Sequence, residues 1–118
     1  MFYFEKLEVW QNARKFTVNI YRVTERFPNE EKFGIVSQMR RASMSICANI
    51  SEGISRKTNK DKSRFLNLSY GSAIEVLNFL IIANDLEYIE QEEYLKLRKE
   101  IELITNQLNR LYNKLKND

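Results

Sequence analysis

Apolar residues recur along this chain every three or four positions, the period of an amphipathic α-helix, in four separate segments. The spacing predicts helices over about residues 6–26, 30–54, 59–84 and 91–116. Short connections between helices of similar length make neighbouring helices antiparallel. We therefore predict an all-α fold, an antiparallel up-down-up-down four-helix bundle, that forms a single domain over residues 1–118.

Local signals set the expected helix ends. Pro28 ends the first helix, because proline lacks an amide proton and disfavours helical backbone at the residue before it. Asn29 is then a good N-cap for the second helix. Thr58 followed by Asp61 resembles a capping box with a shorter acid, so the third helix should begin near Asn59.

The stretch QMRRASMSICANISEG, residues 38–53, is rich in small side chains. At helical spacing it presents an uncharged arc and, beside it, a narrow polar file made of Gln38, Arg41, Ser45, Asn49 and Glu52. One interpretation is a hydrogen-bonded seam between closely packed helices, and the other is a half-solvated helix edge. Gly53 either ends this helix or marks close packing, and the pattern does not separate the two.

The third segment is apolar almost all round between Ala73 and Ala83, with only Glu75 and Asn78 strongly polar. A helix of this kind is buried on several sides, and one small bundle does not cover every side, so we expect self-association. A buried Glu75 would need a partner. Arg41 is the first candidate and Arg40 the second, and a catalytic role for Glu75 is the alternative.

Composition excludes several kinds of chemistry. The chain has no histidine and one cysteine, Cys47, and its three glycines are widely separated. The sequence therefore lacks the commonest transition-metal ligand and any nucleophile activated by histidine. It also lacks a glycine-rich phosphate loop. We predict no enzyme activity, no cofactor and no metal site, and we interpret Cys47 as a small buried thiol. No signal peptide or stretch of 18 uncharged apolar residues is visible, so we predict a cytoplasmic protein without a membrane partner.

Positive charge is concentrated in one connection. The chain has a net charge of +3, and five cations gather between residues 55 and 64 against the single carboxylate of Asp61. These cations, Arg56, Lys57, Lys60, Lys62 and Arg64, are the candidate nucleic-acid-binding residues. The alternative is a solvated turn with no ligand.

Three segments resemble a known family: LEVWQNA at residues 7–13, RFPNEEKFGIVSQMRRASMSICANISEG at 26–53, and RFLNLSYGSAIEVLNFL at 64–80. The family consists of small four-helix-bundle proteins encoded in intervening sequences of bacterial 23S rRNA genes. Matching positions include Trp10, Ala13, Phe27, Pro28, Gly34, Gln38, Arg40, Arg41, Ser45, Asn49, Glu52, Gly53, Gly71, Ser72 and Glu75. Ile35 and Ser51 replace a leucine and an alanine of the family pattern.

The resemblance implies a ring-shaped homopentamer. It also implies a relation to the accessory proteins of diversity-generating retroelements, which bind nucleic acid and a reverse transcriptase. Our leading hypothesis is therefore a non-enzymatic oligomer that binds RNA or a ribonucleoprotein through the basic connection. The alternative is a protein-interaction scaffold, for example for a reverse transcriptase, without nucleic-acid contact. A third hypothesis, an enzyme using Arg41, Glu52 and Glu75, needs a pocket that gathers those groups.

Overall fold

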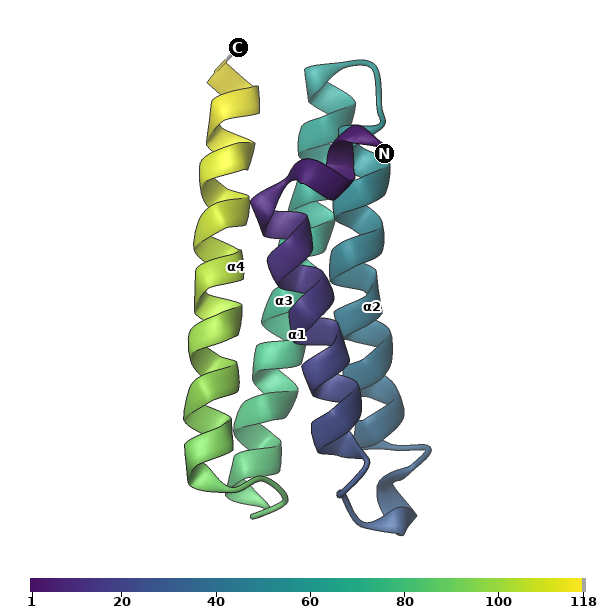
Figure 1. Ribbon diagram of the computed structural model, residues 1–118, viewed down its shortest axis with the longest axis vertical. Helices are drawn as coiled ribbons and strands as arrows, with labels where there is room; N and C mark the ends of the chain where they lie inside the picture. Colours follow the sequence, from purple (N-terminus) through teal and green to yellow (C-terminus); the bar gives the residue numbers. More distant parts are fainter. Residues whose placement is uncertain (118) are drawn as a thin grey trace.

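The computed structural model describes residues 1–117, which form a four-helix bundle (Figure 1). The helices are α1 Glu8–Thr24, α2 Ile35–Ile54, α3 Asn59–Asp85 and α4 Gln91–Asn117, with 3₁₀ helices η1 Tyr3–Lys6 and η2 Asn29–Glu31. No β-strand occurs in this range. The predicted fold class is confirmed. The predicted single domain runs to Asp118, which lies outside the described residues.

Consecutive helices run antiparallel and lie side by side around a rod 45 Å long and about 23 Å across. α1 packs on α2, α2 on α3, α3 on α4, and α4 closes the ring on α1. The α2–α3 contact is the most extensive and the α1–α4 contact the least. Polar pairs bridge the looser α1–α4 side, where Asn12 Nδ2 donates to Gln107 Oε1 at 3.0 Å and Asn19 Nδ2 to Glu100 Oε1 at 3.1 Å.

The second helix begins later than the sequence predicted. Asn29 opens the short η2 helix instead of capping α2, which begins only at Ile35. Gly34 precedes it with φ −105° and ψ −115°, a non-helical backbone that separates the two elements. Glu31 contacts the connection between α3 and α4, where Tyr88 Oη donates a hydrogen bond to its Oε2 at 2.8 Å. The expected start of α3 is confirmed, since Thr58 Oγ1 accepts a hydrogen bond from the Asp61 amide at 3.1 Å.

The core is a continuous apolar column to which every helix contributes. Its largest fully buried members are Phe16, Ile20, Met39, Ile46, Ile50, Leu66, Val76, Leu80, Ile101, Ile104 and Leu108. The buried hydroxyls inside the column are all satisfied by backbone carbonyls. Ser69 makes such a bond between helices, from its Oγ to the Ile46 carbonyl at 2.9 Å.

Gly53 is buried inside α2 at the closest approach to α3. A Cβ atom added there would lie 2.7 Å from the Phe65 Cβ and 3.3 Å from the Lys62 carbonyl oxygen. Of the two interpretations that the sequence left open, close packing therefore holds, and the helix ends one residue later at Ile54. A side chain here would push the two helices apart.

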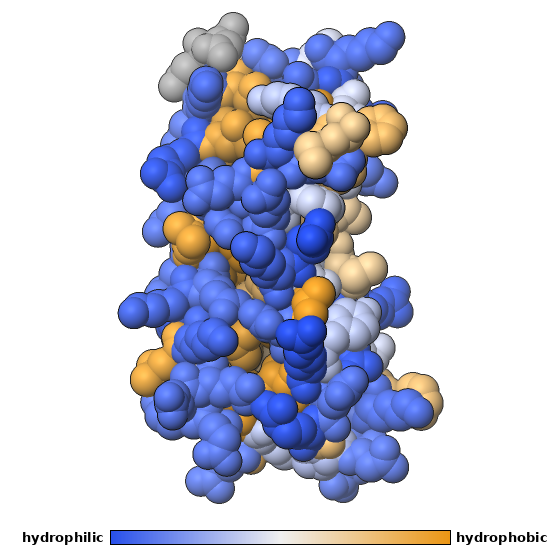
Figure 2. Space-filling view, viewed as in Figure 1, coloured by the Kyte–Doolittle hydropathy of each residue, from blue (hydrophilic) through white to orange (hydrophobic). Residues whose placement is uncertain are grey.

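Part of the apolar surface of α3 stays uncovered in the single chain, as expected for one small bundle. Leu68 is 50% exposed, and Ile74, Ile81 and Ile82 are 37–43% exposed in the single chain. By contrast, the face that α1 and α4 present in Figure 2 is mostly hydrophilic, with apolar residues in separate spots. The uncovered apolar surface thus includes a part of α3 that the other three helices leave open.

By length and composition, α3 is also apolar enough to cross a membrane. Core helices of soluble bundles meet the same criterion, so the feature is weak. The absence of a membrane partner therefore stays a prediction.

We expect Gly53→Ala to destabilise the chain by about 1–3 kcal/mol, because the added methyl group overpacks the α2–α3 contact. Urea unfolding followed by circular dichroism at low protein concentration measures this change. Gly71→Ala is the matched control, since an added Cβ at Gly71 meets no atom within 4 Å. It should keep or raise stability by up to about 1 kcal/mol. Equal effects at both positions would contradict the close-packing argument.

Candidate nucleic-acid interface

The two ends of the bundle carry opposite charge. The connection with Arg56 and Lys57, the chain's N-terminus and the last turns of α4 lie at one end of the rod (Figure 1). Lys114 and Lys116 belong to the last turn of α4. We call this the basic end. The opposite end has acidic residues in the first turns of η2 and α4, namely Glu30, Glu31, Glu92 and Glu93.

The five predicted cations lie at the basic end but do not share one face. The Arg56 and Arg64 guanidinium groups stack over the Phe65 ring, with Cζ atoms 4.5 and 4.7 Å from its centroid. Lys57 and Lys60 are exposed. Lys62 is half-buried and precedes the fully buried Leu66 by one helical turn, so it lies on the inward side of α3.

Among the residues that the structure describes, these cations have no carboxylate partner. Within residues 1–117 the ion pairs shorter than 4 Å are Arg26–Glu93 and Arg98–Glu102, and neither includes them. The stacking on Phe65 restrains two guanidinium groups without neutralising their charge. An ordered group of unpaired cations is suited to a polyanion such as a nucleic-acid backbone.

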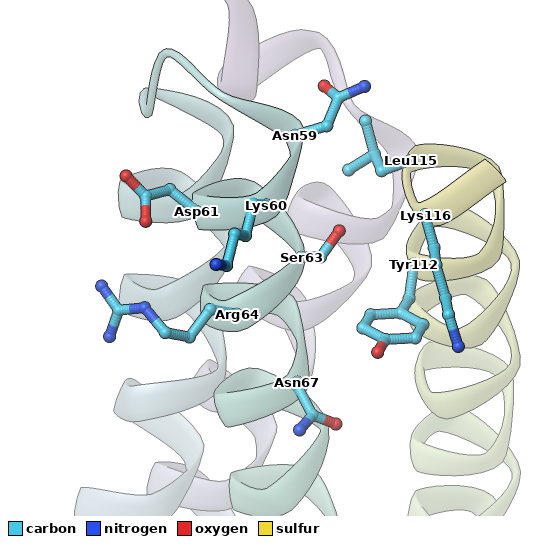
Figure 3. A pocket seen from close by; sticks show the side chains of 9 residues that line it. All are labelled: Asn59, Lys60, Asp61, Ser63, Arg64, Asn67, Tyr112, Leu115 and Lys116. Atoms are coloured by element: carbon cyan, nitrogen blue, oxygen red, sulfur yellow. The ribbon is translucent and has the colours of Figure 1, made fainter. Parts of the chain in front are cut away.

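A groove that the sequence did not reveal lies between the first turns of α3 and the last turns of α4 (Figure 3). Its volume is about 510 Å³, and it is lined by Asn59, Lys60, Asp61, Ser63, Arg64, Asn67, Tyr112, Leu115 and Lys116. In Figure 3 the Ser63 hydroxyl and Leu115 point toward the space between the helices, whereas Asp61 and Arg64 point away from it. Within residues 1–117, the Ser63 Oγ is buried without a hydrogen-bond partner.

A second hollow of about 270 Å³ continues this groove, because it shares Asn67 and Tyr112 with the first. Its remaining lining residues are Leu66, Tyr70, Leu108, Asn109 and Asn113. One sequence signal could have pointed here. Asparagine is a poor helix former, yet four asparagines occur at groove positions of two long helices.

The polar file of α2 divides into two parts. Asn49 Nδ2 donates to the Ser45 carbonyl at 2.9 Å and to Ser45 Oγ at 3.0 Å, and Ser72 Oγ of α3 lies 3.0 Å from Ser45 Oγ. These residues form the predicted seam. Gln38, Arg41 and Glu52 are exposed, so the solvated-edge interpretation describes them.

The prediction that Glu75 is buried is wrong, because its side chain is exposed in the single chain. It forms no ion pair with Arg41 or Arg40 in the described chain. Arg40 is engaged on α1, where its Nε donates to Thr24 Oγ1 at 3.0 Å and its guanidinium stacks on Tyr21. The Ser45–Ser72 contact sets the register of the antiparallel α2 and α3. Arg41 and Glu75, each about one turn from that contact, therefore lie at the same level of the bundle on its outside.

The hypothesis of an enzyme using Arg41, Glu52 and Glu75 lacks the pocket that it needs. Glu52 lines a hollow with Phe4, Ser51, Ser55 and Arg56, and neither Arg41 nor Glu75 reaches it. Among residues 1–117, no three histidine, cysteine, aspartate or glutamate side chains are placed to hold a metal ion. That the chain is not an enzyme stays a prediction.

Cys47 faces α1, half-buried, with its Sγ 3.6 Å from Thr17 Oγ1. Burial raises the pKa of the thiol above its usual value, and the Thr17 hydroxyl offsets part of that shift. The thiol is therefore protonated at neutral pH, which makes it a poor nucleophile.

Comparison with known proteins places the chain in context. The family model for the 23S rRNA-intervening sequence protein matches residues 5–110. Among solved structures, a protein with unknown function from the S23 ribosomal protein family of Bacteroides thetaiotaomicron VPI-5482 superposes with a TM-score of 0.80. It is 25% identical, and the match covers 88% of this chain and 97% of that one. A search of curated proteins gave no match.

We expect Cys47 in the folded chain to react with a thiol reagent such as dithionitrobenzoate at least about tenfold more slowly than in urea at pH 7.5, because burial holds it in the protonated form. Raising the pH should accelerate the folded chain's reaction further into the alkaline range than that of the unfolded chain. The thiol titration is read by absorbance. A folded chain that reacts as fast as the unfolded one at pH 7.5 would contradict the assignment.

Proposed function

Because this chain belongs to the family of 23S rRNA-intervening sequence proteins, we propose that it is an oligomeric, non-enzymatic bundle that binds RNA or a ribonucleoprotein through its basic end. The observation that carries the proposal is the cluster of cations from Arg56 to Arg64. It has no carboxylate partner within residues 1–117 and lies opposite an acidic end. This charge separation directs a polyanion to one end of the rod.

Binding of this kind depends on charge and shape, not on base sequence. Each phosphate neutralised by lysine or arginine releases counterions, so affinity falls steeply with salt. One copy offers few cations, but several copies in one assembly present the cluster repeatedly to the same RNA. Contacts to linked sites strengthen one another through effective concentration.

The uncovered surface of α3 supports self-association. Gly71 lies in the middle of this 27-residue helix, and a Cβ there would meet nothing within 4 Å in the chain. Glycine at such a position lowers helix stability by about 1 kcal/mol relative to alanine. No contact among the described residues requires a glycine here, whereas close approach of a second copy would. Exposed Leu68 and Ile74 lie one turn away on the same outward side.

Arg41 and Glu75 fit the same interface. Both are exposed at one level beside the uncovered part of α3, and neither has a partner in the described chain. We assign the predicted Arg41–Glu75 ion pair to a contact between copies in place of a contact within one chain. A homopentameric ring, as the family resemblance implies, is our proposal for the assembly, and we propose the cytoplasm as its location.

A second candidate function is a scaffold that binds a protein such as a reverse transcriptase without touching nucleic acid. Phe33, near the acidic end, favours it, because this residue is 89% exposed, with the Lys32 ammonium 5.7 Å from the centre of its ring. Exposed aromatic residues are common in protein interfaces.

Reversing two charges at the basic end tests the RNA proposal. We expect Lys57→Glu with Lys60→Glu to weaken binding of a fluorescein-labelled RNA at least about tenfold. The slope of log affinity against log salt should become shallower by roughly 0.7 for each phosphate that the chain no longer neutralises. Fluorescence anisotropy between 50 and 200 mM salt measures both quantities.

The matched control, Lys32→Glu with Lys96→Glu, makes the same charge change away from the basic end. It should bind almost as the unchanged chain does. Binding that is insensitive to salt, or no RNA binding at low salt, would remove the proposal. A protein partner retained by a chain that binds no RNA would favour the scaffold.

A charge swap tests the proposed interface. We expect Arg41→Glu or Glu75→Arg alone to weaken association at least about tenfold, because each places like charges opposite one another between copies. The double swap should restore association, since it re-forms the pair in reverse. Analytical ultracentrifugation measures the assembly, and circular dichroism confirms that each variant folds. Single variants that assemble normally would show that the pair does not cross between copies.

A further inference from the structure

We infer that the groove between α3 and α4 at the basic end binds a single-stranded stretch of RNA, with one base stacked on Tyr112. The inference rests on the proposed RNA binding and deepens it, because it names the form of RNA and the surface that holds it. A cluster of cations alone would accept a duplex equally well. The groove adds features that only an unpaired base can use.

The size of the groove suits nucleotides. Its volume of about 510 Å³ falls within the range of pockets that hold small organic ligands. The adjoining hollow of about 270 Å³ extends it along the α3–α4 boundary, because both share Asn67 and Tyr112. A strand entering at the basic end thus has room for consecutive nucleotides, with Tyr112 lining the first space and Tyr70 contributing to the second.

The lining combines the side chains that single-stranded RNA sites use. Aromatic rings stack on unpaired bases, and Tyr112 and Tyr70 are both half-buried, so each ring is fixed by packing and yet partly exposed. Asparagine amides donate and accept hydrogen bonds, as base edges do. They line the groove at Asn59, Asn67, Asn109 and Asn113. A base paired within a duplex cannot reach a ring at the groove wall.

Lysines border the groove where the phosphates would lie. Lys60 of α3 and Lys116 of α4 line the groove from its two sides and are exposed, and in Figure 3 both side chains extend outward along their helices. The carboxylate of Asp61 points away from the groove (Figure 3), and within residues 1–117 neither lysine forms an ion pair shorter than 4 Å. The Ser63 Oγ on the wall has no hydrogen-bond partner within residues 1–117.

A second copy of the chain is the competing occupant of this groove. The cores of protein interfaces are depleted in lysine and serine, and the lining of this groove contains both types. Its lining therefore favours RNA over a second copy. The exposed apolar residues Leu68 and Ile82 elsewhere on α3 suit a protein neighbour better.

Substitution of one ring tests the inference on the full chain. The probes are a fluorescein-labelled ten-nucleotide oligouridine and a labelled RNA duplex of ten base pairs. We expect Tyr112→Leu to weaken oligouridine binding at least about fivefold, the lower limit for loss of one stacked base. Duplex affinity should stay within about twofold. Tyr112→Phe, which keeps the ring, should bind both probes as the unchanged chain does.

The outcomes separate this inference from the proposal beneath it. If Tyr112→Leu binds oligouridine normally while the unchanged chain binds RNA with a steep salt dependence, the groove inference is overturned and the proposed function stands. If the unchanged chain binds neither probe at low salt, both fail. If Tyr112→Leu changes the size of the assembly in analytical ultracentrifugation, the groove belongs to a contact between copies and the inference is overturned.

A measurement on the unchanged chain covers the case in which Tyr112→Leu fails to fold. Oligouridine carrying 5-iodouridine forms a covalent bond to a stacked aromatic ring under ultraviolet light, and mass spectrometry locates the modified residue. We expect modification at Tyr112, with Tyr70 as the second position. Modification found only outside the groove would overturn the inference.

Discussion

The close contact between α2 and α3 is the constraint on which the rest of the molecule depends. At Gly53 the two backbones approach so closely that a methyl group would meet the Phe65 Cβ at 2.7 Å. The Ser69–Ile46 hydrogen bond, at 2.9 Å, and the Ser45–Ser72 contact fix the register along the same boundary. The connection between these two antiparallel helices, and with it the cations around Phe65, lies at one end of the rod. The position of the basic end thus depends on the antiparallel packing of α2 and α3.

Much of this arrangement could be predicted from the sequence, and the failures have specific causes. Helical periodicity indicated the bundle, and the Thr58 cap marked the start of α3 to the residue. The start of α2 was wrong because Gly34 adopts a non-helical backbone that no periodicity indicates. The groove was missed because its lining residues come from two helices far apart in the chain. We expected Glu75 to be buried because its neighbours in the sequence are apolar. Apolar neighbours indicate burial, but they do not show whether the same chain or a second one covers the helix.

That last error is informative about the assembly. The sequence of α3 is that of a helix covered on several sides, whereas the single chain leaves Leu68, Ile74, Ile81 and Ile82 more than a third exposed. The apolar sequence of α3 would be buried if another copy of the chain covered the part that the single chain leaves exposed. Gly71 agrees, because its lack of a side chain serves no contact within residues 1–117. These features of α3 support the proposed self-association.

The proposed ring also relates assembly to RNA binding. Cyclic symmetry turns every copy about one axis, so in a ring whose rods lie along that axis each copy presents the same end to the same side. The cation clusters then gather on one side and repel one another, while the acidic ends gather on the other. An RNA bound across the basic side screens this repulsion and gains several contacts at once. Because linkage is reciprocal, RNA that binds better to the ring than to the single chain must also stabilise the ring. A weak cationic surface on each copy thereby becomes selective for the assembled state.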